Sequence, residues 1–130
     1  MGEAWRSISQ ADIFAAHRRI AGAVTRTPLI RAHALSDRLG GEIWFKLESL
    51  QPTGAFKLRG ATNALSQLPA AAKAAGVVCV STGNHGRGLA HAGRVLGIRV
   101  VVCMSLLVPA VKVEGIRKLG AEVRIHGASQ

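Results

Sequence analysis

The second half of the chain alternates short apolar runs with segments of helical length. The runs VVCV over 77–80, RVVVCM over 99–104 and EVRIH over 122–126 carry β-branched residues and are long enough for strands. The segments 86–96 and 109–119 carry apolar residues at helical spacing. Apolar strands separated by helices are typical of a parallel sheet that is buried on both faces. The pattern therefore predicts an α/β fold with an open parallel sheet and flanking helices.

The first half of the chain has a different pattern. A helix over 10–22 follows the capping arrangement Ser9-Gln-Ala-Asp12. A short helix over 32–39 stops at a glycine pair, and the run 42–48 predicts a strand. The repeated alternation of strand and helix begins only after residue 70.

Composition and charge narrow the class of protein. The chain has 130 residues, of which 48% are hydrophobic, so one domain of modest size can form a core. Its formal net charge is +10, but Lys and Arg are scattered and the aromatic residues are two Trp and three Phe. A basic, solvated surface explains this charge better than a nucleic-acid site does, so we expect no nucleic-acid partner.

Localisation and cysteine chemistry follow from what the sequence lacks. No run of about 18 apolar residues is present, and the first ten residues lack a secretory pattern, which predicts a cytoplasmic protein without a membrane partner. Cys79 and Cys103 lie in strand-like runs without metal-ligand spacing. We therefore expect two small buried side chains, with no metal site.

A polar, glycine-rich loop, STGNHGRG, stands between a predicted strand and the start of a predicted helix over Ser81–Gly88. Ligands of open α/β sheets bind at this edge, and free N–H groups at a helix start favour an anion. The glycine spacing differs from the dinucleotide-binding pattern, and a tight structural turn is an equally good interpretation of spacing alone. The side chains of Ser81, Thr82, Asn84 and His85 favour a ligand, because buried polar groups need partners. For His85 taken alone, a capping role is the simpler interpretation.

A lysine stands between two large apolar residues in the stretch TGAFKLRG, where the pattern predicts a helix over 55–68 capped by Thr53. The positive end of the helix dipole, the nearby Arg59 and the apolar neighbours all favour loss of a proton from Lys57. A neutral amine is what a Schiff base with a carbonyl cofactor requires. The simpler interpretation is a solvated surface lysine.

The stretches LQPTGAFKLRGATNAL and VSTGNHGRGLAHAGRVLGI together resemble the serine/threonine dehydratases, a family of pyridoxal-phosphate (PLP) enzymes of fold type II that also holds serine racemases. The resemblance continues in HRRIAGAVTRTPL and VPAVKVEGIRKLGAEVRI, and so covers nearly the whole chain. The related cysteine synthases usually carry Asp-Arg after the lysine and Thr in place of His85, so KLRGA and GNHG are similar to the dehydratase branch. The stretch with CMSLLVP is most similar to the hydroxyectoine utilization dehydratases.

The resemblance implies a tryptophan synthase β-like fold, pyridoxal 5'-phosphate as cofactor and a Schiff base at Lys57. It also implies that Phe56 packs beside the cofactor and that Asn84 donates a hydrogen bond to its phenolic oxygen. The substrate carboxylate would be held by the loop residues Ser81, Thr82, Gly83, Asn84 and His85.

The same resemblance implies two lobes: residues 1–69 belong to the large PLP-binding lobe, and residues 70–130 form an incomplete small α/β domain. The family's phosphate cup and the Ser or Cys that faces the pyridine nitrogen are expected in a later half that the sequence does not contain. We therefore expect an N-terminal fragment of an enzyme of roughly 300 residues, inactive alone and homo-oligomeric at full length.

The implied reaction is the dehydration and deamination of a small-molecule amino acid, L-threonine or L-serine, to a 2-oxo acid and ammonia. Three alternatives stay open. Serine racemase-like activity is one, with Thr82 supplying a hydroxyl. The others are a non-catalytic anion-binding module and a basic nucleic-acid binder.

Overall fold

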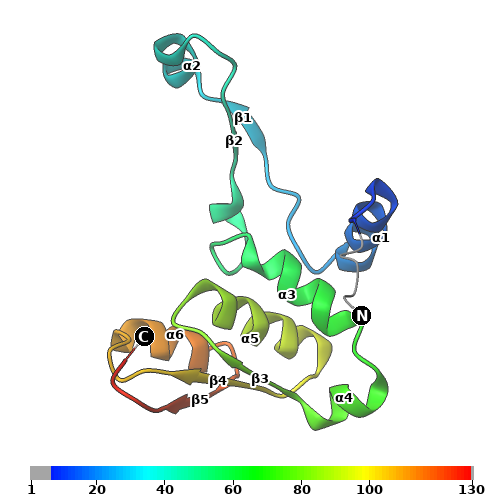
Figure 1. Cartoon of the computed structure of the whole chain (residues 1–130), viewed down its shortest axis with the longest axis vertical. Helices are drawn as coiled ribbons and strands as arrows, with labels where there is room; N and C mark the ends of the chain where they lie inside the picture. Colours follow the sequence, from blue (N-terminus) through cyan, green and yellow to red (C-terminus); the bar gives the residue numbers. More distant parts are fainter. Residues whose placement is uncertain (1–6, 130) are drawn as a thin grey trace, which may run out of the picture.

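The computed structural model describes residues 7–129, so six of the ten N-terminal residues that lack a secretory pattern lie outside the described range. The elements follow the chain in the order α1 Gln10–Ile20, β1 Leu29–Arg31, α2 His33–Leu39, β2 Trp44–Lys46, the 3-10 helix η1 Glu48–Leu50, α3 Lys57–Ser66, α4 Ala70–Ala75, β3 Val77–Val80, α5 Asn84–Leu96, β4 Val100–Met104, α6 Ala110–Arg117 and β5 Glu122–Ile125. An α/β body carries a projecting N-terminal part (Figure 1).

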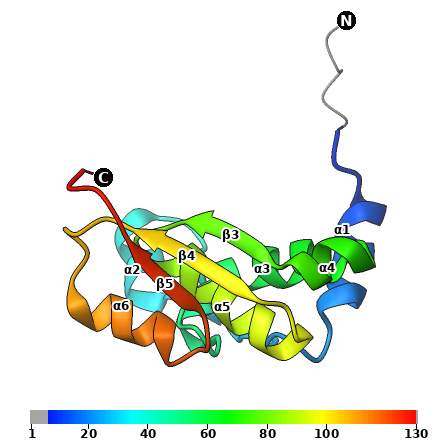
Figure 2. The same ribbon diagram turned by 90° about the horizontal axis from the view of Figure 1, so that it is seen from below.

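The sheet of the body is parallel, with the strand order β3-β4-β5, which confirms the predicted fold class. Crossovers between parallel strands are right-handed, so strands that follow one another in order place their connecting helices on the same face. Figure 2 shows α5 and α6 together below the sheet. The prediction of burial on both faces is confirmed for the central strand, where Val100, Val101 and Val102 are all buried, and is wrong for β3, whose Val78 and Val80 are 69% and 82% exposed.

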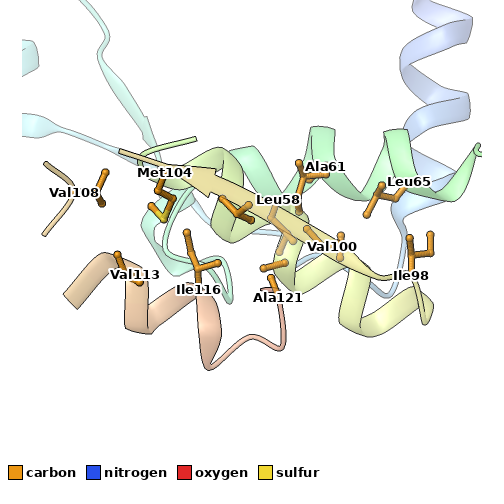
Figure 3. Packing of buried hydrophobic residues seen from close by; sticks show 14 residues of the cluster. Leu58, Ala61, Leu65, Ile98, Val100, Met104, Val108, Val113, Ile116 and Ala121 are labelled. Atoms are coloured by element: carbon orange, nitrogen blue, oxygen red, sulfur yellow. The ribbon is translucent and has the colours of Figure 1, made fainter. Parts of the chain in front are cut away.

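The core lies between this sheet and its helices (Figure 3). Its fully buried side chains include Leu58 of α3, Val102 of β4 and Ile116 of α6, each of which stabilises the fold by roughly 1.5–3 kcal/mol. Helix α3 thus shares one core with the sheet, across the predicted lobe boundary at residue 69. The division of the full enzyme into lobes stays a prediction.

The two cysteines are free and half-buried. Cys79 packs against the core, and burial, followed by the neighbouring Cys103, raises the pKa of its thiol. This agrees with small packing side chains, although neither is fully buried.

Small residues let α5 approach both of its neighbours. A Cβ added at Gly93 would lie 2.3 Å from Val100 Cγ2, and one added at Gly86 would lie 3.0 Å from Val102 Cγ1. These two glycines are seven residues apart, which places them on the same helix face, toward β4. A third glycine, Gly88, lies toward α3 instead.

The projecting arm, residues 29–46, consists of an antiparallel pair of short strands with α2 at its tip (Figure 1). Leu29 pairs with Lys46 and Arg31 with Trp44. Helix α2 ends at Gly40, whose φ of 67° is the left-handed conformation that glycine adopts readily. The prediction for this helix is confirmed, whereas the predicted strand 42–48 is shorter, at 44–46.

The start of α3 corrects one prediction. The helix begins at Lys57, its N-cap is Phe56, and no side chain caps it. Thr53 lies before a turn at Gly54, whose φ is 72°, and its hydroxyl donates at 3.5 Å to the carbonyl of Ala55. Thr53 is therefore too far back along the chain to reach the free N–H groups of the helix.

The other helix boundaries differ less. The capping arrangement at Ser9 and Asp12 is confirmed, with reciprocal bonds of 3.2 and 2.9 Å. Helix α5 begins two residues earlier than predicted, at Asn84. Helix α4 was not predicted, although the sequence AAAKAA has high helix propensity.

Candidate active site

Lys57 is the first residue of α3, and its side chain is exposed. Its Nζ lies 5.2 Å from the centre of the Phe56 ring, which is itself 57% exposed. Leu58 points into the core instead. The two apolar neighbours therefore do not enclose the amine as the sequence suggested. The Phe56 ring lies beside the amine, and the Leu58 side chain packs in the core.

Arg59 does not act on Lys57 as a free charge, because it pairs with Glu48. Its Nε donates to Glu48 Oε2 at 2.9 Å and its second terminal nitrogen donates to Oε1 at 2.7 Å. This two-bond geometry is the strongest form of carboxylate–arginine contact. The sequence pattern did not predict this pairing.

Glu48 and Arg59 belong to a larger group that we call the polar junction: the side chains of Thr27, Glu48, Gln51 and Arg59. Thr27 Oγ1 donates to Glu48 Oε1 at 2.6 Å, and Gln51 Nε2 donates to Oε2 at 3.2 Å. Gln51 also exchanges two hydrogen bonds with the backbone of Thr25. The junction therefore ties the start of α3 to the segment before the arm.

The donors of the polar junction stabilise the ionised form of Glu48. The hydrogen bond from Arg59, followed by those from Thr27 and Gln51, lowers the pKa of Glu48 to about 2, although burial opposes the shift. The same pairing raises the pKa of Arg59. Both charges are thus held in place by each other, with Arg59 two residues after Lys57 in the same helix.

The loop after β3 is held partly by its own polar groups. Ser81 Oγ accepts hydrogen bonds from the N–H groups of Gly83 and Gly86, at 3.3 and 2.9 Å. Asn84 and His85 are exposed at the start of α5, where backbone N–H groups have no acceptor within the helix. N–H groups at a helix start favour an anion, and of those in this loop the N–H groups of Gly83 and Gly86 already donate to Ser81 Oγ.

The helix that follows this loop lies directly against the lysine-bearing turn. A Cβ added at Gly88 would come within 3.2 Å of the carbonyl carbon and oxygen of Lys57 and within 3.3 Å of Leu58 N. The two stretches that the sequence singled out are thus brought together by packing of α3 on α5 (Figure 1).

A hollow of about 610 Å³ borders the loop at Thr82, at the carboxyl ends of the strands. Its lining combines apolar and polar side chains, among them Val80, Met104, Arg124 and His126. Lys57 does not line it. Among the described residues, this hollow therefore does not join the lysine to the loop.

The molecule is thus an α/β protein in which a lysine-bearing helix start packs against the helix that follows a loop at the end of a parallel strand. Residues 20–130 match the family model described as pyridoxal-phosphate dependent enzyme, and the chain belongs to this family. The family is PLP-dependent.

Relatives and solved structures agree with this family. A protein of Sinorhizobium fredii with a provisional threonine dehydratase name is 51% identical over 124 residues, which are 95% of this chain and 37% of the relative. The L-threonine ammonia-lyase of Thermotoga maritima is 41% identical over 92% of this chain and 30% of its own length. The chain thus spans about a third of the curated relatives that it matches.

The structural comparison gives the same fold. A serine racemase from Dictyostelium discoideum superposes with a TM-score of 0.87 at 38% identity, covering 92% of this chain and 39% of that one. Threonine deaminase isoform 2 from Solanum lycopersicum superposes with a TM-score of 0.80 at 33% identity. The chain therefore has the fold of the N-terminal part of fold type II PLP enzymes.

The described residues fit part of a PLP site. The donor set contains a reachable primary amine at Lys57, an exposed flat ring at Phe56 and a side-chain amide at Asn84. The amine suits the carbonyl group of PLP, the ring suits its pyridine ring, and the amide suits its phenolic oxygen.

Between residues 7 and 129, we find no helix that combines the length and the apolar character needed to cross a bilayer.

Proposed function

We propose that this chain is part of a PLP-dependent ammonia-lyase that converts a hydroxy amino acid, L-threonine or L-serine, to a 2-oxo acid and ammonia. The observation that supports the proposal is the contact of Gly88 with the backbone of Lys57, which brings the lysine-bearing turn against the helix that follows the loop. The 41% identity to an L-threonine ammonia-lyase supports the reaction class.

Each site residue has a proposed role. Lys57 holds PLP covalently, Phe56 packs beside its ring and Asn84 donates a hydrogen bond to its phenolic oxygen. The substrate carboxylate is bound by the loop residues Ser81, Thr82, Gly83, Asn84 and His85. Because Ser81 Oγ already accepts two loop N–H groups, we assign it the task of shaping the loop, with its own proton free to reach the carboxylate.

PLP, when bound, withdraws electrons from the substrate α-carbon and so makes its proton acidic. The freed amine of Lys57 takes that proton, which requires a neutral Nζ within reach of the carbon. The Lys57 ammonium would then return this proton to the β-hydroxyl, which would leave as water as its C–O bond breaks. The released enamine tautomerises to an imine, whose hydrolysis consumes one water and gives the 2-oxo acid and ammonia.

Several finer assignments are part of the proposal. The stretch CMSLLVP supports a substrate related to hydroxyectoine breakdown. We place the protein in the cytoplasm as a homo-oligomer at full length, with residues 1–69 in a large lobe and 70–130 in a small one. Because the chain spans about a third of its relatives, we expect it to be inactive alone.

Racemisation is the second candidate, because a serine racemase superposes with a TM-score of 0.87. Thr82 would then supply the hydroxyl that returns a proton on the opposite face of the substrate. Full-length enzyme given L-serine decides between the two: we expect pyruvate to form faster than D-serine. Faster formation of D-serine would replace the dehydratase assignment.

The test of cofactor attachment uses the 130-residue chain with PLP, borohydride reduction and mass mapping of the labelled peptides. We expect label on Lys57, lost in Lys57→Ala and kept in the matched control Lys112→Ala, an exposed lysine of α6. A folded chain that carries no label on Lys57, or the same label on all its lysines, would contradict the assignment.

A further inference from the structure

The geometry points to Glu48 as a positioning residue for Lys57: through Arg59 it holds the first turn of α3, which has no side-chain cap. This inference rests on the proposed function, because it assigns a purpose to the position of Lys57. Glu48 lies before that turn, in η1, and Arg59 lies within the turn itself. Glu48 therefore acts on the amine through the helix backbone.

The start of α3 has little of its own to hold it. The first four N–H groups of a helix have no partner inside the helix, and no side chain caps them here. Helix ends of this kind fray. The amine of Lys57 is exposed and lies over the Phe56 ring, which is exposed as well, so its place depends on the backbone beneath it.

The pair of Glu48 and Arg59 closes the segment that carries the lysine. It joins residue 48 to residue 59, so the turn at Gly54 and Lys57 both lie inside the closed segment. Its bonds measure 2.9 and 2.7 Å, and the side chains of Glu48 and Arg59 are only 18% and 28% exposed, so solvent screens this pair less than an exposed one. Loss of the pair returns to the segment the conformational entropy that closure removes.

The far end of this connection is itself fixed. Glu48 accepts from Thr27 at 2.6 Å and from Gln51 at 3.2 Å. Gln51 is 3% exposed and exchanges two hydrogen bonds with the backbone of Thr25. Arg59 also donates to the Thr25 carbonyl at 3.1 Å. The first turn of α3 is thus tied to two separate stretches of chain, η1 and the segment before the arm.

The displacement expected from losing the pair exceeds what a covalent site tolerates. A residue rises about 1.5 Å along a helix and about 3.3 Å along an extended chain, so each residue that unwinds shifts the chain by roughly 2 Å. A covalent site tolerates only about 0.5 Å. Leu58 anchors the core side of the turn, but apolar packing is non-directional. The reaction of Lys57 with PLP should therefore depend on Glu48.

The experiment compares variants of the 130-residue chain. Glu48→Gln is the test, because it keeps the shape of the side chain but loses its charge and one of the two oxygens that Arg59 binds. Glu122→Gln is the matched control, since it disrupts an ion pair with Arg124 of the same 2.7 Å length on β5.

A conservative variant, Glu48→Asp, keeps a carboxylate that the long Arg59 side chain can follow. All variants are also measured in trimethylamine N-oxide, which favours the folded state and keeps a weakened variant comparable.

Two readouts are recorded for each variant. The first is the rate of amide hydrogen exchange at Ala61, whose N–H closes the first turn on the carbonyl of Lys57, divided by the rate at Ala92 in the core face of α5. This exchange ratio reports local opening, because a loss of stability of the whole chain changes both rates alike. The second is the rate of borohydride-trapped PLP labelling at Lys57, divided by the rate at exposed Lys112.

For Glu48→Gln we expect the exchange ratio to rise by about tenfold and the labelling ratio to fall by about fivefold or more. Glu122→Gln should change neither ratio, and Glu48→Asp should recover about half or more of both changes.

An unchanged exchange ratio in Glu48→Gln would overturn the inference, as would a labelling ratio that stays the same while the turn opens. Equal changes in Glu48→Gln and Glu122→Gln would overturn it too, because they would show that any lost ion pair has this effect. If the parent chain shows no preference for Lys57, the proposed function fails, and the exchange ratio alone then decides whether Glu48 positions the turn.

Discussion

Helix α3 is held on its two sides by contacts of different kinds. Toward α5 it presents Leu58, Ala61 and Leu65, which are buried in the core. On another side it presents Arg59, which binds Glu48 of η1 in the polar junction and donates to the carbonyl of Thr25, in the segment before the arm. Apolar packing is non-directional and insensitive to pH, whereas the junction depends on an ionised carboxylate and on the direction of each donor.

The difference teaches how the site-bearing turn is fixed. Packing on α5 holds the turn beside the helix that follows the loop, and the junction ties the first turn of α3 to η1 and to the segment before the arm. Disturbing one side should leave the other intact, which makes the comparison open to experiment.

The largest effect is expected on the apolar side. Leu58→Ala removes a fully buried side chain and leaves a cavity, which should lower the free energy of unfolding by about 3 kcal/mol. Urea unfolding at pH 7 measures this. Leu107→Ala, at a side chain that is 59% exposed, is the control and should change the value little. Equal effects of the two substitutions would mean that the α3–α5 contact is not the core of this body.

Of the two sets of contacts that hold α3, we expect low pH to weaken the polar junction and to leave the apolar packing on α5 unchanged. The folded pKa of Glu48 is about 2, below its ordinary value of 4.5, so its contribution is complete above pH 4.5 and is lost as pH falls toward 2. The full shift corresponds to at most about 3 kcal/mol, of which about half should be lost by pH 3 to 3.5.

The measurement is urea unfolding across this pH range. Glu48→Gln should remove this part of the acid dependence, and Glu114→Gln on the exposed side of α6 should keep it. Stability that is flat between pH 5 and pH 3 in the parent chain would show that the junction does not hold Glu48 in its ionised form.

The smallest effect is expected from a single donor of the junction. Thr27→Val keeps the shape but removes the hydroxyl that donates to Glu48, which should cost about 1.5 kcal/mol. Thr53→Val is the matched control, because its buried hydroxyl makes only a 3.5 Å contact with a neutral carbonyl. The measurement is thermal unfolding of the two variants. Equal melting temperatures for Thr27→Val and Thr53→Val would contradict the role of Thr27.

The local pattern of apolar residues predicts the strands and helices of the α/β body well, but it predicts poorly where α3 begins. The apolar runs at β3 and β4 and the spacing along α5 are strong signals, because each element repeats its own period over several residues. The start of α3 is different, since it is set by the turn at Gly54 and by tertiary contacts. Thr53 is a good capping residue by type but stands four residues before the helix.

Site prediction divides in the same way. The motifs around Lys57 and the loop at Ser81 are local, so the sequence displays them. The pairing of Arg59 with Glu48 joins residues from two elements and appears only when α3 packs beside the segment before it. The exposed face of β3 is missed for a related reason, because the apolar run of this strand does not say which of its two faces the rest of the fold covers.

The strand order β3-β4-β5 also has a kinetic meaning. Strand β4 is hydrogen-bonded to β3, and β5 to β4. A chain leaving the ribosome can therefore add these strands to the sheet in the order of synthesis, and no later strand has to insert between two earlier ones. Helix α5 closes on α3 early in that process. The turn at Lys57 is thus expected to acquire its neighbour Gly88 while the sheet is still growing.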